Sequence, residues 1–196
     1  MQEDAIRVFF HELGHFLAHE INHRRFKGTG VRSISITPYP GSAHLYEGDT
    51  KINVSPDGKE NMIPEIDALP EFLAAVTYGC IFQSYYQNKD RLNDCTNLHG
   101  GIDYAQWWTS LCRHAFDLDK PEFIKVESDY YTSLRKDKAL AVMMELDPNK
   151  YMKDIGGNIY EVDVDLLRQD TSPFIDAHLE RYKNLLEGYT KIIERQ

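Results

Sequence analysis

The residues best suited to chemistry in this sequence are His11, Glu12 and His15, which form an H-E-x-x-H motif. On an α-helix, positions i and i+4 lie on one face about one turn apart, so two imidazoles can offer nitrogens to one metal ion. Glu12 can then reach a metal-activated water without itself binding the metal. The motif therefore predicts a zinc site in which Glu12 acts as general base.

A helix over residues 3–25 must position this motif. Apolar residues recur there at helical spacing, no proline interrupts the segment, and acids at its start and bases at its end suit the helix dipole. Gly14 costs about 1 kcal/mol in a helix relative to alanine, which indicates a steric use beside the metal-binding face. The alternative is a core helix whose histidines are only hydrogen-bonded, and the pattern favours the metal site.

The remaining elements predict a mainly helical α+β protein with a small β-meander after the first helix. Period-2 alternation predicts a strand over 31–37, ended by Pro38. Shorter strands are expected over 42–46 and 51–54, with turns at Gly48-Asp49 and at 56–58. Further helices are expected over 64–88, 102–116, 122–146 and 173–193, with Pro173 opening the last. Residues 147–172 are expected to form a loop with a short strand near 159–164.

Length and composition limit the possible classes. A chain of 196 residues with 42% hydrophobic and 12% aromatic residues predicts one domain with a real core. A net charge of −9 without a basic block argues against nucleic acid or an anionic membrane as partner. The sequence has no apolar run near about 18 residues, so no membrane span is expected. The first ten residues also lack the pattern of a signal peptide.

The three cysteines are Cys80, Cys95 and Cys112, an odd number without C-x-x-C spacing. Such cysteines are typical of reduced thiols in a cytoplasmic protein, because disulfide frameworks and zinc ribbons use paired cysteines. We therefore expect neither a disulfide nor a second zinc site from them.

The third zinc ligand distinguishes the families that share H-E-x-x-H, since a catalytic zinc usually takes three protein ligands. A metzincin would need glycine at position 18 and histidine at position 21, where this chain has Ala18 and Ile21. His19 and His23 extend the i+4 series, but the helix face drifts with each step. We therefore interpret both as solvated or supporting histidines.

The order of the motifs resembles the proteolytic domain of the FtsH-type ATP-dependent zinc metalloproteases. That family shows H-E-A-G-H, a following strand of the form V-x-K-V-T-I-x-P, a helix with G-G-R-x-A-E, and then G-A-S-N-D. The matching segments here are residues 11–15, the strand at 31–38, the helix with Tyr78-Gly79-Cys80, and the segment Gly100-Gly101-Ile102-Asp103. The similarity spans roughly residues 5 to 115.

This resemblance implies a zincin-like helical metallopeptidase domain over residues 1–196, with the metal-site core in 1–118 and a helical part in 119–196. It implies Zn²⁺ on His11, His15 and Asp103, with Glu12 as the catalytic base of a zinc metalloendopeptidase that cleaves peptide or protein substrates. Asp103 also suits this role physically, because a helix start keeps a carboxylate ionised and oriented. Three other carboxylates remain candidates for the third ligand: Asp94, Glu65 and Glu71.

The chain departs from the family at two positions, since Cys80 and Gln83 stand where the family has arginine and glutamate. The printed sequence also has no AAA ATPase module. Two other functions therefore stay open: an ImmA/IrrE-like regulatory zinc protease, and a catalytically inactive FtsH-like zinc-binding or interaction domain. The strand Ile34–Pro38 and the late aspartate argue against the regulatory family.

Substrate contacts follow less directly from the sequence. The strand Val31–Thr37 is expected to be an edge on which an extended peptide adds as another strand. His44, His99 and Tyr104 are candidates for stabilising an oxyanion, and the sequence does not separate them.

Overall fold

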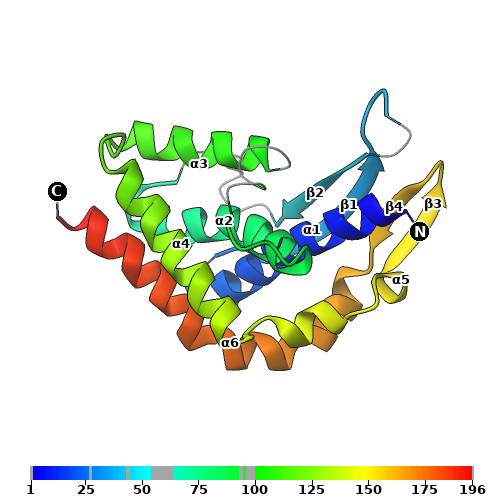
Figure 1. Ribbon diagram of the computed structural model, residues 1–196. Coiled ribbons are helices and arrows are strands. Elements are labelled where there is room, and N and C mark those ends of the chain that lie inside the picture. The colour runs from blue at the N-terminus through cyan, green and yellow to red at the C-terminus, as the bar shows by residue number, and fades with distance from the viewer. Residues whose placement is uncertain are drawn as a thin grey trace.

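The computed structural model describes residues 2–26, 28–42, 45–53, 64–92, 95 and 100–195. Its helices are α1 (Glu3–Arg25), α2 (Leu69–Tyr86), α3 (Gly101–Arg113), α4 (Lys120–Lys136), α5 (Pro148–Tyr151) and α6 (Val164–Ile193), with short 3₁₀ segments η1 (Ile66–Ala68) and η3 (Ala141–Glu145). Its strands are β1 (Val31–Pro38), β2 (Tyr46–Ile52), β3 (Met152–Gly156) and β4 (Ile159–Val162). The mainly helical α+β class is confirmed (Figure 1).

Helix α1 has the bounds that the pattern predicted, and most of its residues are buried. Glu12 faces strand β2, whereas Gly14 faces helix α2, because two residues turn an α-helix by about 200°. A Cβ at Gly14 would lie 2.2 Å from the carbonyl oxygen of Tyr78. Only glycine therefore permits this approach of α1 to α2, so the steric use expected of Gly14 is in helix packing.

The sheet is antiparallel with strand order β2-β1-β4-β3. Strand β1 pairs on both sides, so that Ile34 lies opposite Thr50 of β2 and also opposite Val162 of β4. The prediction that Val31–Thr37 forms a free edge is therefore wrong. Strand β4 of the second hairpin, β3–β4, pairs with the side of β1 that was expected to be free. This hairpin is distant from β1 in the sequence, so the residues around β1 do not indicate the pairing.

Strand β2 is one continuous strand, so the turn predicted at Gly48-Asp49 is wrong. Both residues pair with β1, Gly48 opposite Ile36 and Asp49 opposite Ser35. The hydrogen-bonded ladder outweighs the local turn preference of a Gly-Asp pair. Within the described residues β2 has β1 as its only strand neighbour and is an edge of the sheet. The turn expected at 56–58 lies outside the described residues.

The C-terminal part differs most from the sequence prediction. Helix α4 ends at Lys136 rather than near residue 146, and α5, β3 and β4 occupy much of the segment expected to be loop. The expected strand near 159–164 is confirmed as β4. Helix α6 begins at Val164 and contains Pro173 inside it. The Asp163 side chain accepts the Leu166 N–H at 2.9 Å, and this N-cap begins the helix before the proline.

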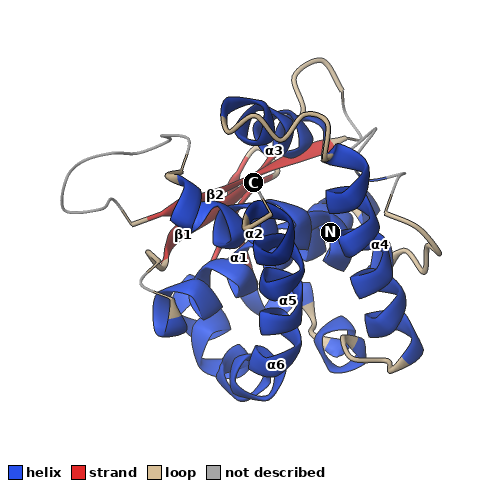
Figure 2. Ribbon diagram, turned by 90° about the vertical axis from the view of Figure 1, so that its left-hand side faces the viewer, coloured by secondary structure: helices blue, strands red, loops and turns tan. Residues whose placement is uncertain are grey.

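Helix α1 contacts α2 on one side and strands β1 and β2 on the other, and α6 packs against α1, α2 and α4 and also contacts β1 (Figures 1 and 2). A single hydrophobic core includes Phe16 of α1, Phe82 of α2, Phe123 of α4 and Tyr182 of α6. The 119–196 segment thus contributes to the same core as the N-terminal part.

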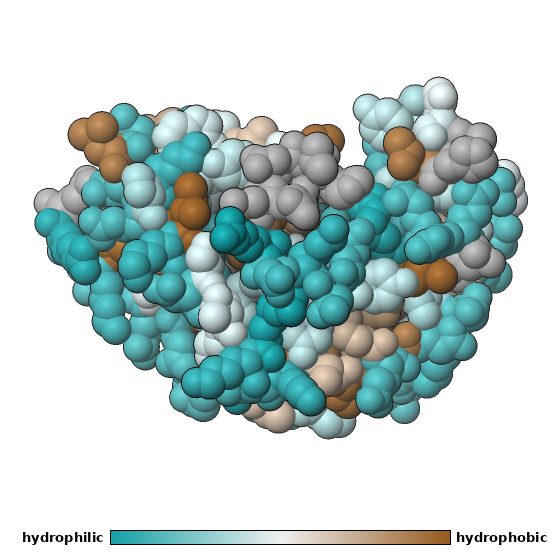
Figure 3. Space-filling view, viewed as in Figure 1, coloured by the Kyte–Doolittle hydropathy of each residue, from teal (hydrophilic) through white to brown (hydrophobic). Residues whose placement is uncertain are grey.

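In the described part of the chain, no helix combines the length and the apolar character needed to cross a membrane. On the face shown in Figure 3, exposed hydrophobic residues stand apart from one another among hydrophilic ones. Among the described large hydrophobic residues, the highest exposed fractions are 87% for Leu118 and 75% for Ile102. Exposed hydrophobic residues spaced in this way are ordinary for a folded domain.

Candidate metal centre

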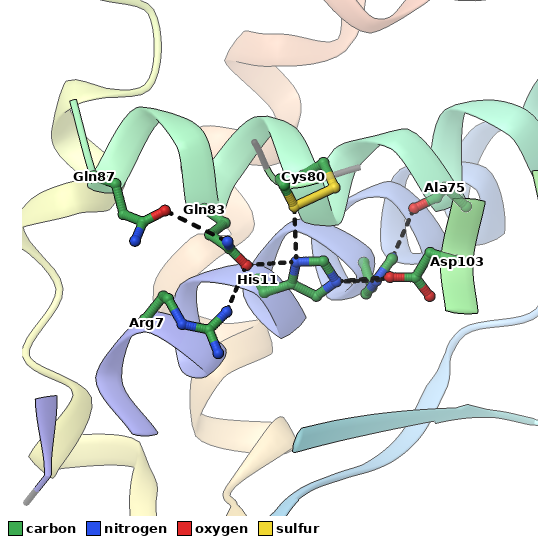
Figure 4. The surroundings of a disulfide bond; sticks show 9 residues. Arg7, His11, Ala75, Cys80, Gln83, Gln87 and Asp103 are labelled. Carbon is green, nitrogen blue, oxygen red and sulfur yellow. Dashed lines mark hydrogen bonds and ion pairs between the residues drawn. A yellow bond between two sulfur atoms is a disulfide. The ribbon is translucent and has the colours of Figure 1, made fainter. Parts of the chain in front are cut away.

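Three of the side chains singled out in the sequence meet at one point. The Nε2 atom of His11 lies 2.8 Å from Oδ2 of Asp103, and Nε2 of His15 lies 3.0 Å from Nε2 of His11 and 3.4 Å from Oδ2 of Asp103. The histidines come from the middle of α1 and the carboxylate from the first turn of α3. Figure 4 shows Asp103 beside the His11 ring, on the side opposite Gln83.

The outer nitrogen of each imidazole has a fixed acceptor. His11 Nδ1 donates to Oε1 of Gln83 at 3.1 Å, and Arg7 Nη1 donates to the same oxygen at 2.9 Å. Because a guanidinium only donates, it orients the Gln83 amide with its oxygen toward both groups. His15 Nδ1 donates to the carbonyl oxygen of Ala75 at 2.8 Å. Both Nε2 atoms are thereby turned toward the centre, the arrangement usual for metal-binding histidines.

The Nε2 lone pairs of the two histidines and the Asp103 carboxylate point toward one another, so a positive charge between them is needed to offset their repulsion. Burial alone would lower the pKa of His15, but the nearby Asp103 carboxylate raises that pKa to about 9. Burial alone would raise the pKa of Asp103, yet the charges and hydrogen bonds of His15 and His11 lower that pKa well below its usual range. The converging groups therefore favour a bound positive charge, either a proton or a metal ion in its place.

The donor set and the space around it fit zinc. Two imidazole nitrogens and one carboxylate oxygen are a ligand set of zinc hydrolases. A Cβ at Gly79 of α2 would lie 2.5 Å from Nε2 of His15 and 2.8 Å from Nε2 of His11. The glycine thus leaves open the space next to the two nitrogens. Gly79 also packs against the backbone of α1, because a Cβ at Gly14 would lie 2.9 Å from the backbone nitrogen of Gly79.

Glu12 lies beside this cluster and is held by strand β2. Its Oε2 accepts a hydrogen bond from Thr50 Oγ1 at 2.6 Å. Its carboxylate oxygen, a His11 nitrogen and a His15 nitrogen all lie within 4.8 Å of one another. The side chain is buried, so the carboxylate occupies a confined space next to the centre. This is the position that a general base toward an activated water requires.

The other candidates from the sequence are placed as follows. Among the described residues, the hydrogen bonds and ion pairs of the His11 and His15 ring nitrogens involve Asp103 and neither Glu65 nor Glu71. His23 is exposed, and its Nδ1 contacts the carbonyl oxygen of Gly28 at 3.0 Å. His19 is half-buried on α1, and burial lowers its pKa to about 4. Asp94, His44 and His99 lie outside the described residues.

Tyr104, the third candidate for stabilising an oxyanion, follows Asp103 on α3. Its ring stacks on Trp107 with centroids 5.4 Å apart, and the Lys120 ammonium lies 5.2 Å from the ring centroid. These contacts explain how the ring is held and do not assign its hydroxyl a role.

The expectation that all three cysteines are reduced is wrong. Cys80 and Cys95 form a disulfide, while Cys112 is free and exposed. The odd number of cysteines led to the wrong prediction because Cys112 is a free cysteine in addition to the bonded pair. The only signal for the pair was its position, since Cys80 lies in α2 and Cys95 in the segment that connects α2 to Asp103. The cysteines therefore no longer argue for a reducing compartment.

Two groups at the site were not recognised from the sequence. Thr50 and Gly48 of β2 contact Glu12, and the predicted turn at Gly48-Asp49 concealed them. No role at the site is expected of Arg7 from the sequence, although its guanidinium orients Gln83. Its one-turn spacing from His11 was the signal that could have indicated a shared helix face.

Neither a family model, nor a curated protein, nor a solved structure matches this chain. The resemblance to the FtsH-type proteases therefore rests on the sequence motifs and stays a prediction.

Proposed function

We propose that this protein is a zinc-dependent metallopeptidase in which His11, His15 and Asp103 hold the metal and Glu12 is the general base. The observation that carries the proposal is the convergence of two imidazole nitrogens and one carboxylate oxygen, within 3.4 Å of one another, beside a buried glutamate. When bound, a zinc ion would supply Lewis acidity and a water of lowered pKa.

The chain's own residues would do the proton chemistry. Glu12 would accept a proton from the attacking water and pass it to the amine that leaves when the peptide bond breaks. Thr50 holds one carboxylate oxygen of Glu12 by a hydrogen bond, so the orientation of the base is set before substrate arrives. Gln83 and the Ala75 carbonyl fix the two imidazoles in the same way.

Strand β2 supports a peptide as the substrate class. Pro38, opposite Tyr46, has no N–H, and the Tyr46 N–H points away from β1 to bond Asp4 Oδ2 at 2.7 Å. By the period of a strand, Gly48 and Thr50 also direct their backbone N–H and C=O groups away from β1. An extended peptide could pair with these groups and pass directly beside Glu12. We therefore propose the edge of β2, in place of β1, as the substrate-binding strand.

The test is zinc content and cleavage of an unfolded, fluorescently labelled casein by wild type, Glu12→Gln and His15→Ala. We expect wild type to bind one zinc per chain and to lose cleavage on chelation. Glu12→Gln should keep its zinc and lose activity by about 10²- to 10⁴-fold, the usual contribution of a general base. His15→Ala should lose zinc as well. Glu3→Gln, at an exposed glutamate on the same helix, is the matched control.

Retained cleavage in zinc-loaded Glu12→Gln would refute the mechanism. Stoichiometric zinc without cleavage of any unfolded substrate would instead support an inactive zinc-binding domain. The cytoplasmic location expected from the sequence stays a prediction and is independent of this test.

A further inference from the structure

The disulfide Cys80–Cys95 joins helix α2 to the segment that leads into α3. The two Cα atoms are 5.4 Å apart, and the cysteines are separated by 15 positions in the sequence. Both are deeply buried, with exposed fractions of 3% for Cys80 and 1% for Cys95. This crosslink takes no part in the proton chemistry proposed above, yet it lies against the metal centre (Figure 4).

On one side the disulfide contacts a proposed metal ligand. Sγ of Cys95 lies 3.7 Å from Nδ1 of His11, next to the bond that this nitrogen makes with Gln83. Cys80 follows Gly79, the residue whose missing side chain leaves space for the centre. Any change in the positions of the two sulfur atoms would therefore act directly on the His11 ring.

On the other side the disulfide packs against the start of α3. The Cys95 carbonyl oxygen accepts the Gly100 N–H at 2.7 Å, and a Cβ at Gly100 would lie 2.7 Å from Sγ of Cys80. The Gly100 carbonyl oxygen in turn accepts the Tyr104 N–H at 2.8 Å. Asp103 lies between these two residues, in the first turn of the helix. The crosslink thus fixes the backbone that presents the third ligand.

Helix α3 has few other anchors. Of its residues only Trp107, Ser110 and Leu111 are buried, and all three lie beyond the first turn. The Asp103 side chain itself is 26% exposed. A helix end with so little buried surface is held mainly by the groups that touch it directly. Among the described residues, the disulfide and the two histidines are in direct contact with the start of α3.

We propose that Cys80–Cys95 is a redox-modification site that sets the metal affinity of the centre, by holding Asp103 in place when oxidised and releasing it when reduced. This inference rests on the proposed zinc site. The co-reactant is a small dithiol. One of its thiolates attacks the sulfur of one cysteine, forms a mixed disulfide with it and releases the other cysteine as a thiolate, which takes up a proton. The second thiolate of the dithiol then attacks the dithiol's own bound sulfur and releases the first cysteine. The dithiol is oxidised to a disulfide, and Cys80 and Cys95 each become thiols.

The experiment compares oxidised and dithiol-reduced protein in a Cys112→Ser background, which removes the free thiol, with the double variant Cys80→Ser/Cys95→Ser. The dithiol is removed without air before zinc affinity is measured by competition with a chromophoric chelator. We expect reduction to weaken zinc binding about 10- to 100-fold, the range seen when groups supporting metal ligands are changed. The double serine variant should bind zinc as weakly as the reduced protein, and the dithiol should not change its zinc affinity.

Hydrogen exchange on the metal-free protein gives a second readout. The amides of Gly100 and Tyr104, which donate to the carbonyl oxygens of Cys95 and Gly100, should exchange faster after reduction, and amides in the buried middle of α1 should not. Equal zinc affinity in both redox states would overturn the proposal, and so would unchanged exchange at α3. Tighter binding by the reduced form would also overturn it, because the two thiols and His11, which lie within 4.8 Å of one another, would then be ligands themselves.

These outcomes are separate from a failure of the proposed function. If the zinc affinity depends on the redox state of the disulfide but casein is not cleaved, the proposed role of the disulfide is supported and the proposed peptidase activity is refuted. If oxidised protein bound no zinc at all, the proposed function and the effect on metal affinity would both fail, and exchange at α3 would still decide whether the disulfide holds that helix.

Discussion

Gly48 of β2 lies so close to Glu12 of α1 that a Cβ built on the glycine would fall 2.2 Å from Oε1 of the glutamate. No heavy atom can remain at that distance, so a side chain at position 48 must displace the carboxylate. Strand β2 and Glu12 can therefore pack this closely only because position 48 is a glycine.

The first prediction is that Gly48→Ala lowers peptidase activity while zinc content stays at one per chain. The added methyl group would push Glu12 away from its hydrogen bond with Thr50, and displacement of a reacting group by about 1 Å can cost 10²-fold in rate. Zinc content by elemental analysis and the rate of casein cleavage check both parts. Glu47→Ala, at an exposed neighbour on the other face of β2, should leave both unchanged. Loss of zinc in Gly48→Ala would contradict the prediction.

The second prediction is that Gly79→Ala removes zinc binding without unfolding the protein. Its Cβ would lie within 2.8 Å of the metal-facing nitrogens of His11 and His15, whereas alanine in a helix is itself favourable by about 1 kcal/mol over glycine. Gly14→Ala gives the contrast, since its Cβ would meet the backbone of Tyr78 and should lower the free energy of unfolding. Zinc titration and urea unfolding separate the two effects. Normal zinc affinity in Gly79→Ala would show that the metal does not sit here.

The sequence was sufficient for features that are set by neighbouring residues. The bounds of α1 follow from its apolar spacing and terminal charges, and the pairing of His11 with His15 follows from helix geometry. Asp103, expected from the resemblance and from its place at a helix start, lies 2.8 Å from Nε2 of His11, and its role as a metal ligand stays a prediction.

The sequence was insufficient where distant segments decide the outcome. Strand β1 became an interior strand because β4 pairs with it, and Gly48 lies in a strand because β1 holds it there. The continuation of α6 through Pro173 reflects the cap at Asp163 and a buried helix face on both sides of the proline. No local preference reports these long-range contacts, and the Cys80–Cys95 bond belongs to the same class.

A third prediction concerns the bond between α1 and α6. Arg168 donates to both carboxylate oxygens of Glu20, at 2.9 and 3.1 Å, and to the Val31 carbonyl oxygen at 2.8 Å. Glu20 is 1% exposed. Arg168→Met would leave a buried carboxylate without its partner, which costs about 3–5 kcal/mol of stability. Urea unfolding measures this loss.

The double variant Glu20→Gln/Arg168→Met tests the origin of that loss. It removes the charge together with its partner and keeps an acceptor for the Val31 N–H, which bonds Oε1 of Glu20 at 3.0 Å. We expect it to be more stable than Arg168→Met alone. Arg181→Met, which breaks the exposed pair with Asp137, should cost less than about 1 kcal/mol. A double variant as unstable as the single one would mean that packing of Arg168, rather than the charge on Glu20, is what matters.

A fourth prediction concerns pH and the buried carboxyl of Glu127 on α4. Its Oε1 accepts hydrogen bonds from Thr77, Trp107 and Tyr189, each at 2.8 Å. Burial raises the pKa of Glu127 from 4.5 to about 7, and these hydrogen bonds only partly oppose that effect. Between pH 4.5 and about 7 the folded protein therefore binds a proton that the unfolded chain has lost, so the stability contributed by this group falls as pH rises through that window and then levels off.

The change across the window is at most about 3 kcal/mol, since one pKa unit corresponds to about 1.4 kcal/mol. Glu127→Gln keeps an acceptor oxygen for the three donors and cannot ionise, so its stability relative to wild type should increase from pH 4.5 to 7 and stay constant above. Urea unfolding across this range measures the difference. Glu180→Gln, at an exposed carboxyl on α6, is the control. A similar pH-dependent difference in the control would show that net charge, rather than the burial of Glu127, produces the effect.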